Sequence, residues 1–429
     1  MYVWGKPVAL QALQKSVVVR DSFLPFSPPL IGENEIAEVV DTLRSDWITT
    51  GPKVKRFEQS FAEAVGAPDA LAVSSCTAAL HLSLLALGIG PGDAVITTPL
   101  TFCSGVHVIE HVGAQPVLAD VEAGTLNLDA RAIPAAVERA ERDLGLRVKA
   151  IMPVHLSGHP CDMDPILAIA AERGLAVIED AAHSLPASYK GKTIGSLSIS
   201  ARVPVLTSFS FYATKNLTTA EGGMLVAPPA LLQEARLWSQ HGMSRDAWKR
   251  YSADGSWFYE VVRPGFKYNM TDIQAALGLH QLKKLPVFHQ RRSEIAYRYN
   301  DAFGAIEELE TPTRRAWAGH AWHLYVLRLN LEQMAISRDQ FIAELHSRNI
   351  GTSVHFIPIH LHAFYRDKYG YVPEDFPVAN HEYRRMVSLP CSPRMQKQDV
   401  EDVIDAVTSV VTKFRRPVKA RQFVRAAGR

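Results

Sequence analysis

A regular alternation of strand-like and helical segments between residues 70 and 227 constrains the fold most strongly. The segment 175–179 has no polar alternation, as expected for a strand that is covered on both faces. Repeated β-α-β units predict a largely parallel sheet in a three-layer α/β/α arrangement. The expected helices lie at about 77–87 and 164–173. The expected strands are 71–73, 94–98, 116–119, 148–154, 175–179, 206–211 and 224–227.

The pattern changes beyond residue 230, where helical segments dominate up to about residue 300. Capping boxes at Thr271-x-x-Gln274 and Ser337-x-x-Gln340 predict two helix starts. No serine- or glycine-rich linker is present, so we expect a long helix between two domains. The smaller, C-terminal α+β part should include strands near 323–329 and 353–356. The predicted units are an N-terminal extension (1–23), a large domain (24–280), a small C-terminal domain (281–412) and a basic tail (413–429).

Composition excludes several classes of protein. Hydrophobic residues make up 47% of the chain and charged residues 21%, and the net charge is +2, which favours a globular protein without nucleic-acid partners. The four scattered cysteines form no C-x-x-C motif, which argues against a disulfide scaffold and favours a reducing compartment. No signal-peptide or transmembrane-length apolar run is seen, so we expect a cytoplasmic protein. The basic termini are either solvated ends or a contact for a subunit or an anion.

Lys215 follows a β-prone run of aromatic and hydroxyl residues, 207–214, and precedes the pair Gly222 and Gly223. Such a setting suits a partly desolvated amine, with a pKa below the usual value of about 10.4 and a lone pair for attack on a carbonyl. The commonest aldehyde for such a lysine is pyridoxal phosphate (PLP). The alternative is an ordinary solvated lysine at a strand end.

Further candidates lie where other strands end, which is where open α/β sheets bind ligands. The segment 74–79 passes from a strand directly into a helix, so its free N–H groups and the Thr77 hydroxyl form either an anion site or an ordinary N-cap. Asp180 follows an apolar strand and needs a cation, such as a protonated pyridine ring, unless it caps a helix or forms a structural ion pair. His183 suits stacking on a flat ring or a structural role. Ser210 is close enough in sequence to Lys215 to reach the same ligand.

These groups supply the three attachments that PLP requires, for its phosphate, ring nitrogen and aldehyde. A rival cluster of three histidines suggests a metal site, but no acid or cysteine lies among them and Pro358 bends the segment. We therefore expect no metal. The histidines of this cluster are His355, His360 and His362.

Several motifs resemble those of the DegT/DnrJ/StrS family of sugar aminotransferases, a fold-type-I PLP group, and they occur in the order found in that family. The resemblance covers about residues 24–412. Cys76 departs from it, since many relatives have glycine or alanine there. The motifs that carry the resemblance are 47–54, 76–81, 179–183, 210–216, 221–223, 265–272 and 354–360.

The resemblance implies roles for the matching residues. Lys215 would form the Schiff base (internal aldimine) with PLP and later move the proton between substrate and cofactor. Asp180 would hold the ring nitrogen, and Phe102 and His183 would lie on the two ring faces. The implied phosphate ligands are Thr77, the Ala78 amide, Ser210 and, across a homodimer interface with shared active sites, Asn269. The implied residues nearer the sugar are Thr50, Lys267, Tyr268, His355 and His360.

The implied reaction is transamination of a nucleotide-linked keto-sugar, with L-glutamate as the amino donor and pyridoxamine phosphate as the form of the cofactor between the two halves. Two other functions occur among the proteins it resembles. A PLP-dependent sugar dehydratase would carry histidine in place of Lys215. A non-catalytic regulator would lack part of the site, and every part is present.

Overall fold

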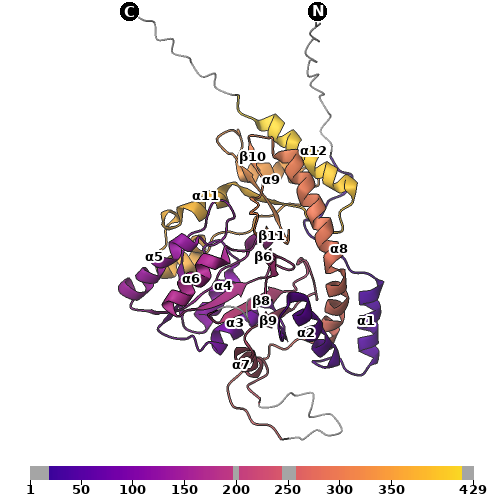
Figure 1. Cartoon of the computed structure of the whole chain (residues 1–429). Coiled ribbons are helices and arrows are strands. Elements are labelled where there is room, and N and C mark those ends of the chain that lie inside the picture. Colours follow the sequence, from indigo (N-terminus) through magenta and orange to yellow (C-terminus); the bar gives the residue numbers. More distant parts are fainter. Residues whose placement is uncertain (1–18, 197–201, 244–257, 418–429) are drawn as a thin grey trace, which may run out of the picture.

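The computed structural model describes residues 19–196, 202–243 and 258–417 (Figure 1). The basic residues Lys6 and Lys15 and the end of the basic tail lie outside the described residues. All four cysteines are unpaired. Within the described ranges, no helix combines the length and apolar character needed to cross a bilayer.

A seven-stranded sheet forms the centre of the larger part of the chain, in the order β1-β9-β8-β5-β4-β2-β3. The neighbouring strands β8-β5-β4-β2-β3 are all parallel to one another. Strand β9 runs antiparallel to its two neighbours, β8 and β1. The mostly parallel sheet predicted from the sequence is therefore confirmed. The strand bounds are β1 Leu71–Val73, β2 Asp93–Thr97, β3 Gln115–Leu118, β4 Arg147–Ile151, β5 Ala176–Asp180, β8 Val205–Ser210 and β9 Gly223–Val226.

Helices cover both faces of this sheet, which completes the predicted three layers (Figure 1). The core on one face includes side chains from α2 Pro52–Val65, α5 Ile133–Glu138 and α6 Met163–Arg173. The cores on the other face include side chains from α3 Cys76–Ala86, α4 Cys103–His111 and α7 Pro229–Ser239. Because both faces are covered, β1, β2, β5 and β9 are buried along their whole length, whereas Arg147 and Lys149 of β4 are exposed.

The long helix α8 (Asp272–Phe303) links this part to the C-terminal part and passes residue 280 without a break. It begins at the predicted capping box of Thr271 and Gln274. The capping box of Ser337 and Gln340 likewise starts α9. The remaining helices of this part are α9 Arg338–His346, α10 Ala363–Tyr369, α11 Pro377–Arg385 and α12 Lys397–Phe414.

The C-terminal part has its own antiparallel sheet, β10-β12-β13, and its own core. The strand predicted at 353–356 is absent. Ser353 forms only a single bridge, to Ser388 of β13, and its neighbours do not extend this pairing into a strand. The N-terminal segment also joins this core, since Leu24 is buried in it and Arg20 pairs with Asp399 and Asp402 of α12. The bounds are β10 Leu309–Glu310, β12 Tyr325–Leu329 and β13 Met386–Leu389. A small sheet between the two parts contains β6 Ser188–Tyr189, β7 Lys192–Thr193 and β11 Ala318–Gly319.

Helix α1 (Glu33–Arg44) packs beside α8 through its polar side (Figure 1). Glu35 is fully buried there and accepts hydrogen bonds from Gln281 and Lys284 of α8. The apolar side instead faces outward, with Ile36 48% and Leu43 57% exposed. The apolar face of α1 therefore does not contribute to the core of this chain.

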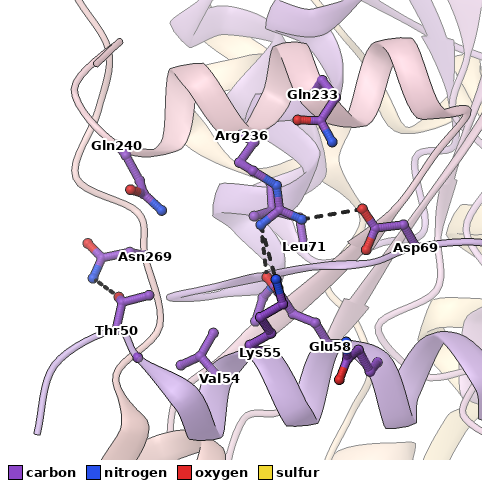
Figure 2. Close-up of a pocket in the computed structure, with 13 residues that line it drawn as sticks. Thr50, Val54, Lys55, Glu58, Asp69, Leu71, Gln233, Arg236, Gln240 and Asn269 are labelled. Carbon is purple, nitrogen blue, oxygen red and sulfur yellow. Dashed lines mark hydrogen bonds and ion pairs between the residues drawn. The ribbon is translucent and has the colours of Figure 1, made fainter. Parts of the chain in front are cut away.

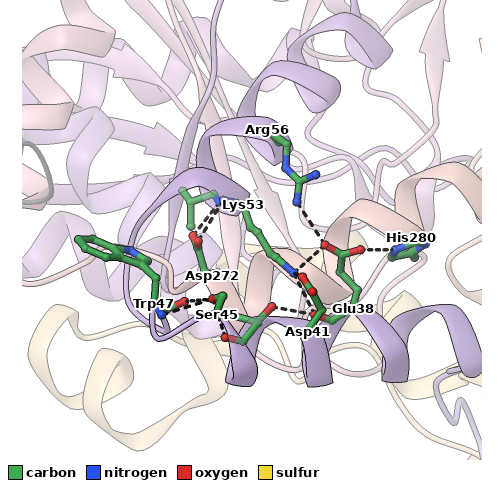
Figure 3. Close-up of polar contacts among 10 residues, drawn as sticks. Glu38, Asp41, Ser45, Trp47, Lys53, Arg56, Asp272 and His280 are labelled. Carbon is green, nitrogen blue, oxygen red and sulfur yellow. Dashed lines mark hydrogen bonds and ion pairs between the residues drawn. The ribbon is translucent and has the colours of Figure 1, made fainter. Parts of the chain in front are cut away.

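The loop before α2 is held by Asp272 at the start of α8 (Figure 3). Its carboxylate accepts hydrogen bonds from the backbone N–H groups of Gly51, Lys53 and Val54 at 2.9–3.0 Å. Lys53 in turn forms ion pairs of 2.7 Å with Glu38 and Asp41 on α1. This network joins α1, α2 and α8, and it fixes the position of the loop that carries Thr50.

Replacing Asp272 with alanine is expected to lower the free energy of unfolding by about 2–3 kcal/mol, because three backbone donors at the start of α2 lose their acceptor. Asp272→Asn keeps one acceptor oxygen, so its free energy of unfolding should decrease by less. Equilibrium denaturation of the two variants beside the wild type measures the difference. Equal stability of Asp272→Ala and the wild type would show that water replaces the carboxylate without cost.

Candidate functional site

A pocket of about 460 Å³ lies where β5 and β8 end and also touches the segment 323–324 and residues 355–356 of the C-terminal part. It brings together residues that are far apart in the sequence, as expected at the carboxyl edge of a mostly parallel sheet. The predicted site residues that line it are Thr77, Phe102, Asp180, His183, Ser210, Lys215 and His355.

Asp180 is the last residue of β5 and is 4% exposed. Its Oδ1 accepts a hydrogen bond from the Ala182 N–H at 3.0 Å, and the Cys76 thiol lies 4.0 Å from the same oxygen. No donor to Oδ2 is found among the described residues. Burial raises the pKa of Asp180, while the Ala182 N–H and the charge of Lys215 oppose the rise. A cationic N–H donor in the pocket would therefore find a desolvated carboxylate oxygen without a protein partner.

Lys215 follows β8 and extends into the same pocket. Burial lowers the pKa of its amine to about 8, although the nearby Asp180 carboxylate opposes this shift. At neutral pH about a tenth of the amine is therefore unprotonated, far more than for an ordinary lysine. This is the property that a nucleophilic and proton-transferring lysine requires.

The rate at which the apoprotein captures PLP through Lys215 is expected to rise with pH and to level off above about pH 8. The sign follows because only the neutral amine attacks the aldehyde, and the neutral fraction grows tenfold per pH unit below the pKa. Stopped-flow absorbance with apoprotein measures this profile. A midpoint near the value for free lysine, about 10.4, would contradict the desolvation of this amine.

The first turn of α3 borders the pocket, and Ser75 is its ordinary N-cap, so the anion site expected from the segment 74–79 stays a prediction. Thr77 lines the pocket, and the N–H groups at this helix start have no intrahelical acceptor. The Ala78 N–H, which was expected to bind phosphate, donates to the Ser75 side chain at 3.1 Å in this structure. A phosphate contact of this amide therefore stays a prediction. Gly223 packs directly behind this turn, where a Cβ atom would lie only 2.4–2.6 Å from the backbone of Ser75 and Cys76.

His183 is buried in the wall of the pocket, and its Nδ1 accepts a hydrogen bond from the Ser157 N–H at 3.2 Å. Burial and the charge of Lys215 hold its pKa well below the usual range, so the ring is neutral with its proton on Nε2. Phe356 stacks 5.8 Å from His183 and lies 5.7 Å from Phe102, measured between ring centroids. The pocket thus has aromatic walls suited to a flat ring.

Thr50 and Asn269 line a different pocket, of about 320 Å³, beside α2 and α7 (Figure 2). The Asn269 amide donates to the Thr50 hydroxyl at 2.6 Å. Arg236 faces the same space and pairs with Glu58 and Asp69 at 3.3 and 3.5 Å. Neither Thr50 nor Asn269 reaches the Lys215 pocket of its own chain, so their contacts with cofactor or substrate stay predictions that require a second subunit.

Three other predicted substrate residues also lie outside the Lys215 pocket. Lys267 is exposed, and the Tyr268 hydroxyl hydrogen-bonds to His81 at 3.1 Å. His360 is fully buried against Phe376, so a direct substrate contact of this residue has no support in this structure. In the described part of the chain, no three or more His, Cys, Asp or Glu side chains are grouped to hold a metal ion.

Sequence reasoning gave no role to several residues that line the pocket. Glu221 and Cys76 were visible as parts of motifs, but nothing in the sequence assigned them a partner. His323 was expected at the start of a strand near 323–329 and lies just before β12, and this expectation gave it no role in the site. The pocket residues without a predicted role are Phe26, Ser75, Cys76, Thr101, Ser104, Val154, Ala182, Tyr212, Thr214, Glu221, Gly222, His323, Leu324 and Phe356.

Known proteins share the sequence and the fold of this chain. Residues 29–408 match the DegT/DnrJ/EryC1/StrS aminotransferase family. The chain belongs to this family. The aminotransferase is 52% identical over 394 residues to the spore coat polysaccharide biosynthesis protein SpsC of Bacillus subtilis, covering 91% of this chain and 98% of SpsC.

Solved structures of the family show the same fold. Spr1654 of Streptococcus pneumoniae, described as a sugar aminotransferase, has a TM-score of 0.82 and 36% identity in its pyridoxamine phosphate (PMP) form, over 91% of this chain and 99% of that chain. Its PLP form has a TM-score of 0.81 with 34% identity over the same shares. PseC of Helicobacter pylori, an aminotransferase of pseudoaminic acid biosynthesis, has a TM-score of 0.81 and 26% identity, over 92% of this chain and 100% of that chain. The fold is that of fold-type-I PLP aminotransferases, and the family is PLP-dependent.

The residues of the Lys215 pocket fit this cofactor. Asp180 Oδ2, which has no partner among the described residues, suits the ring N–H, the first turn of α3 suits the phosphate, and the desolvated Lys215 amine suits the aldehyde. The aromatic walls suit the ring itself. These are separate chemical requirements, and one pocket meets all of them.

Proposed function

We propose that this sugar aminotransferase acts on a nucleotide-linked keto-sugar and takes its amino group from L-glutamate. The single observation that carries the proposal is that Lys215 and Asp180 line one pocket, with the amine desolvated and one carboxylate oxygen free. Lys215 at this position also disfavours the dehydratase reaction. SpsC is named for polysaccharide biosynthesis. A nucleotide-activated sugar is a reasonable substrate because polysaccharide assembly requires activated building blocks.

The chain contributes positioning and proton transfer to this reaction. PLP, when bound, supplies the electron sink for the negative charge left when a proton leaves the substrate carbon. Lys215 would hold that proton on its Nζ and move it between the substrate and the cofactor, a task for which a pKa of about 8 is well matched. Asp180 keeps the ring nitrogen protonated, and the aromatic wall of His183 and Phe356 keeps water from the reacting atoms.

The substrate proposal is tested by incubating the PLP-loaded protein with L-glutamate and a panel of UDP-, GDP- and dTDP-linked keto-sugars. We expect a product mass that corresponds to exchange of the ketone oxygen for an amine, with one nucleotide-sugar strongly preferred. Lys215→Ala protein serves as the matched control and should give no product. Amination of free keto-sugars alone would contradict the proposed nucleotide linkage.

We further propose that the enzyme works as a homodimer with shared active sites. The outward apolar face of α1 and the position of Thr50 and Asn269 away from their own Lys215 pocket support this arrangement. Mixing Lys215→Ala and Asn269→Ala subunits, each impaired alone, should restore roughly a quarter of the wild-type activity, because half of the dimers then carry one intact site. A monomer in light scattering, or a mixture no better than its components, would exclude shared sites.

A further inference from the structure

We propose that His323 is a further substrate-binding residue of the Lys215 pocket, where its unprotonated Nε2 accepts a hydrogen bond from a hydroxyl group of the sugar. This inference rests on the proposed function and deepens it. His323 lies just before β12, far in sequence from the residues that hold the cofactor. It lines the same pocket as Lys215 and His183 and is 5% exposed.

The tautomer of His323 is fixed by Asn216, the residue after Lys215. The Asn216 side-chain NH₂ donates to two backbone carbonyls, those of Leu185 at 2.9 Å and Ala321 at 2.8 Å. Rotating the amide would place its oxygen against both carbonyls, so its Oδ1 must face His323. Oδ1 lies 3.1 Å from His323 Nδ1 and accepts only from an N–H, so the proton of the neutral ring is on Nδ1.

The second nitrogen, Nε2, is consequently an acceptor. No hydrogen bond to it is found in the described ranges. Burial and the neighbouring His183, Lys215, Arg292 and His355 hold the pKa of His323 well below the usual range, so the ring stays neutral. His183 has the opposite tautomer, and the two ring centroids are 4.3 Å apart.

Backbone contacts hold His323 in place. Ala321 N–H donates to Gly158 O at 2.9 Å, and Leu324 N–H donates to Ser157 O at 3.2 Å. Gly158 has φ +92°, and a Cβ there would lie 2.8–3.2 Å from atoms of His183, Ala321 and His323. The same turn therefore positions both histidines, since Ser157 N–H also binds His183.

A neutral acceptor in this place distinguishes between the two substrates. It attracts a hydroxyl group, which can donate, and it gains nothing from a carboxylate, which can only accept. The amino donor, glutamate, carries two carboxylates, and its one donor group, the ammonium, is the group that reacts, whereas a sugar carries several hydroxyls that are free to donate. His323 should therefore assist the sugar half of the reaction and leave the glutamate half nearly unchanged.

The tautomer can be tested without any catalysis. In ¹⁵N-histidine-labelled protein, two-bond ¹⁵N–¹H correlation spectra distinguish Nδ1–H from Nε2–H rings, and the spectrum of His323→Asn protein assigns the signal. We expect the His323 ring to show Nδ1–H and an unprotonated Nε2 between about pH 6 and pH 8. An Nε2–H ring or an imidazolium in that range would overturn the proposal.

The contact can be tested by measuring the two half-reactions separately. In His323→Asn, the shorter amide can still donate to Asn216 but lacks an acceptor at the Nε2 position, whereas in His323→Gln an oxygen can reach that position. We expect His323→Asn to lower kcat/KM of the sugar half by about 3- to 10-fold, as for loss of one hydrogen bond, and the glutamate half by less than about 2-fold. His323→Gln should recover most of the loss.

Equal losses in both half-reactions, or none in His323→Asn, would overturn the role of His323. These outcomes differ from failure of the proposed function. If the wild-type protein aminates no nucleotide keto-sugar, the substrate proposal fails, and the spectrum still decides the tautomer. Cofactor absorbance and thermal unfolding of both variants should match the wild type, which separates a contact from a folding defect.

Discussion

Lys215→Ala protein is expected to lose transamination by at least about 10³- to 10⁴-fold, because both the amine that holds the cofactor and the group that moves the proton are removed. The pocket itself should remain, since the Lys215 amine accepts and donates no hydrogen bond among the described residues. The cofactor should still bind, but without a covalent bond. The measurements are single-turnover kinetics with glutamate and the absorbance of the bound cofactor.

Lys215→Arg is the matched control for charge. It keeps a cation near Asp180 but cannot form a Schiff base, because the guanidinium stays protonated. We therefore expect it to be as inactive as Lys215→Ala. Activity in either variant within about tenfold of the wild type would mean that another group moves the proton.

Asp180→Asn is expected to reduce the rate of the glutamate half-reaction on the order of 10²- to 10³-fold, the range for loss of one preorganised electrostatic partner. Asparagine fits the same space and can still accept one hydrogen bond, but it has no charge to keep the ring nitrogen protonated. The Ala182 N–H bond to this side chain should survive, so the fold should not change. Rapid-mixing absorbance measures the rate.

Asp180→Glu is the companion variant, because it keeps the charge on a longer side chain. The rate of its glutamate half-reaction should lie between those of the wild type and Asp180→Asn. A full rate in Asp180→Asn would show that the ring nitrogen is held by another group or that its proton is not needed.

The Lys215 and Asp180 hypotheses were accessible from sequence because Asp180 ends an apolar strand and Lys215 follows the end of another strand by five residues. In a parallel sheet the carboxyl ends of the strands lie at one edge, and this holds for any length or conformation of the connecting loops. The capping boxes of α8 and α9 were accessible for a similar reason, since a helix start is encoded within four residues.

Other features depend on residues that are distant in the sequence. The capping of α2 could not be predicted from its local sequence, because the carboxylate that caps it belongs to Asp272 on α8. The outward apolar face of α1 is decided by Glu35, whose partners also lie on α8. The position of His323 depends on Asn216 and on the turn at Ser157 and Gly158, so no local pattern indicates it.

The most direct test is to reduce the PLP-loaded enzyme with borohydride, digest it and find the modified peptide by mass spectrometry. A stable link between the amine of residue 215 and the cofactor, absent after prior conversion with glutamate, is the result expected for a desolvated lysine at this strand end. Cofactor attached to a different lysine, or to none, would contradict the assignment on which the proposed reaction depends.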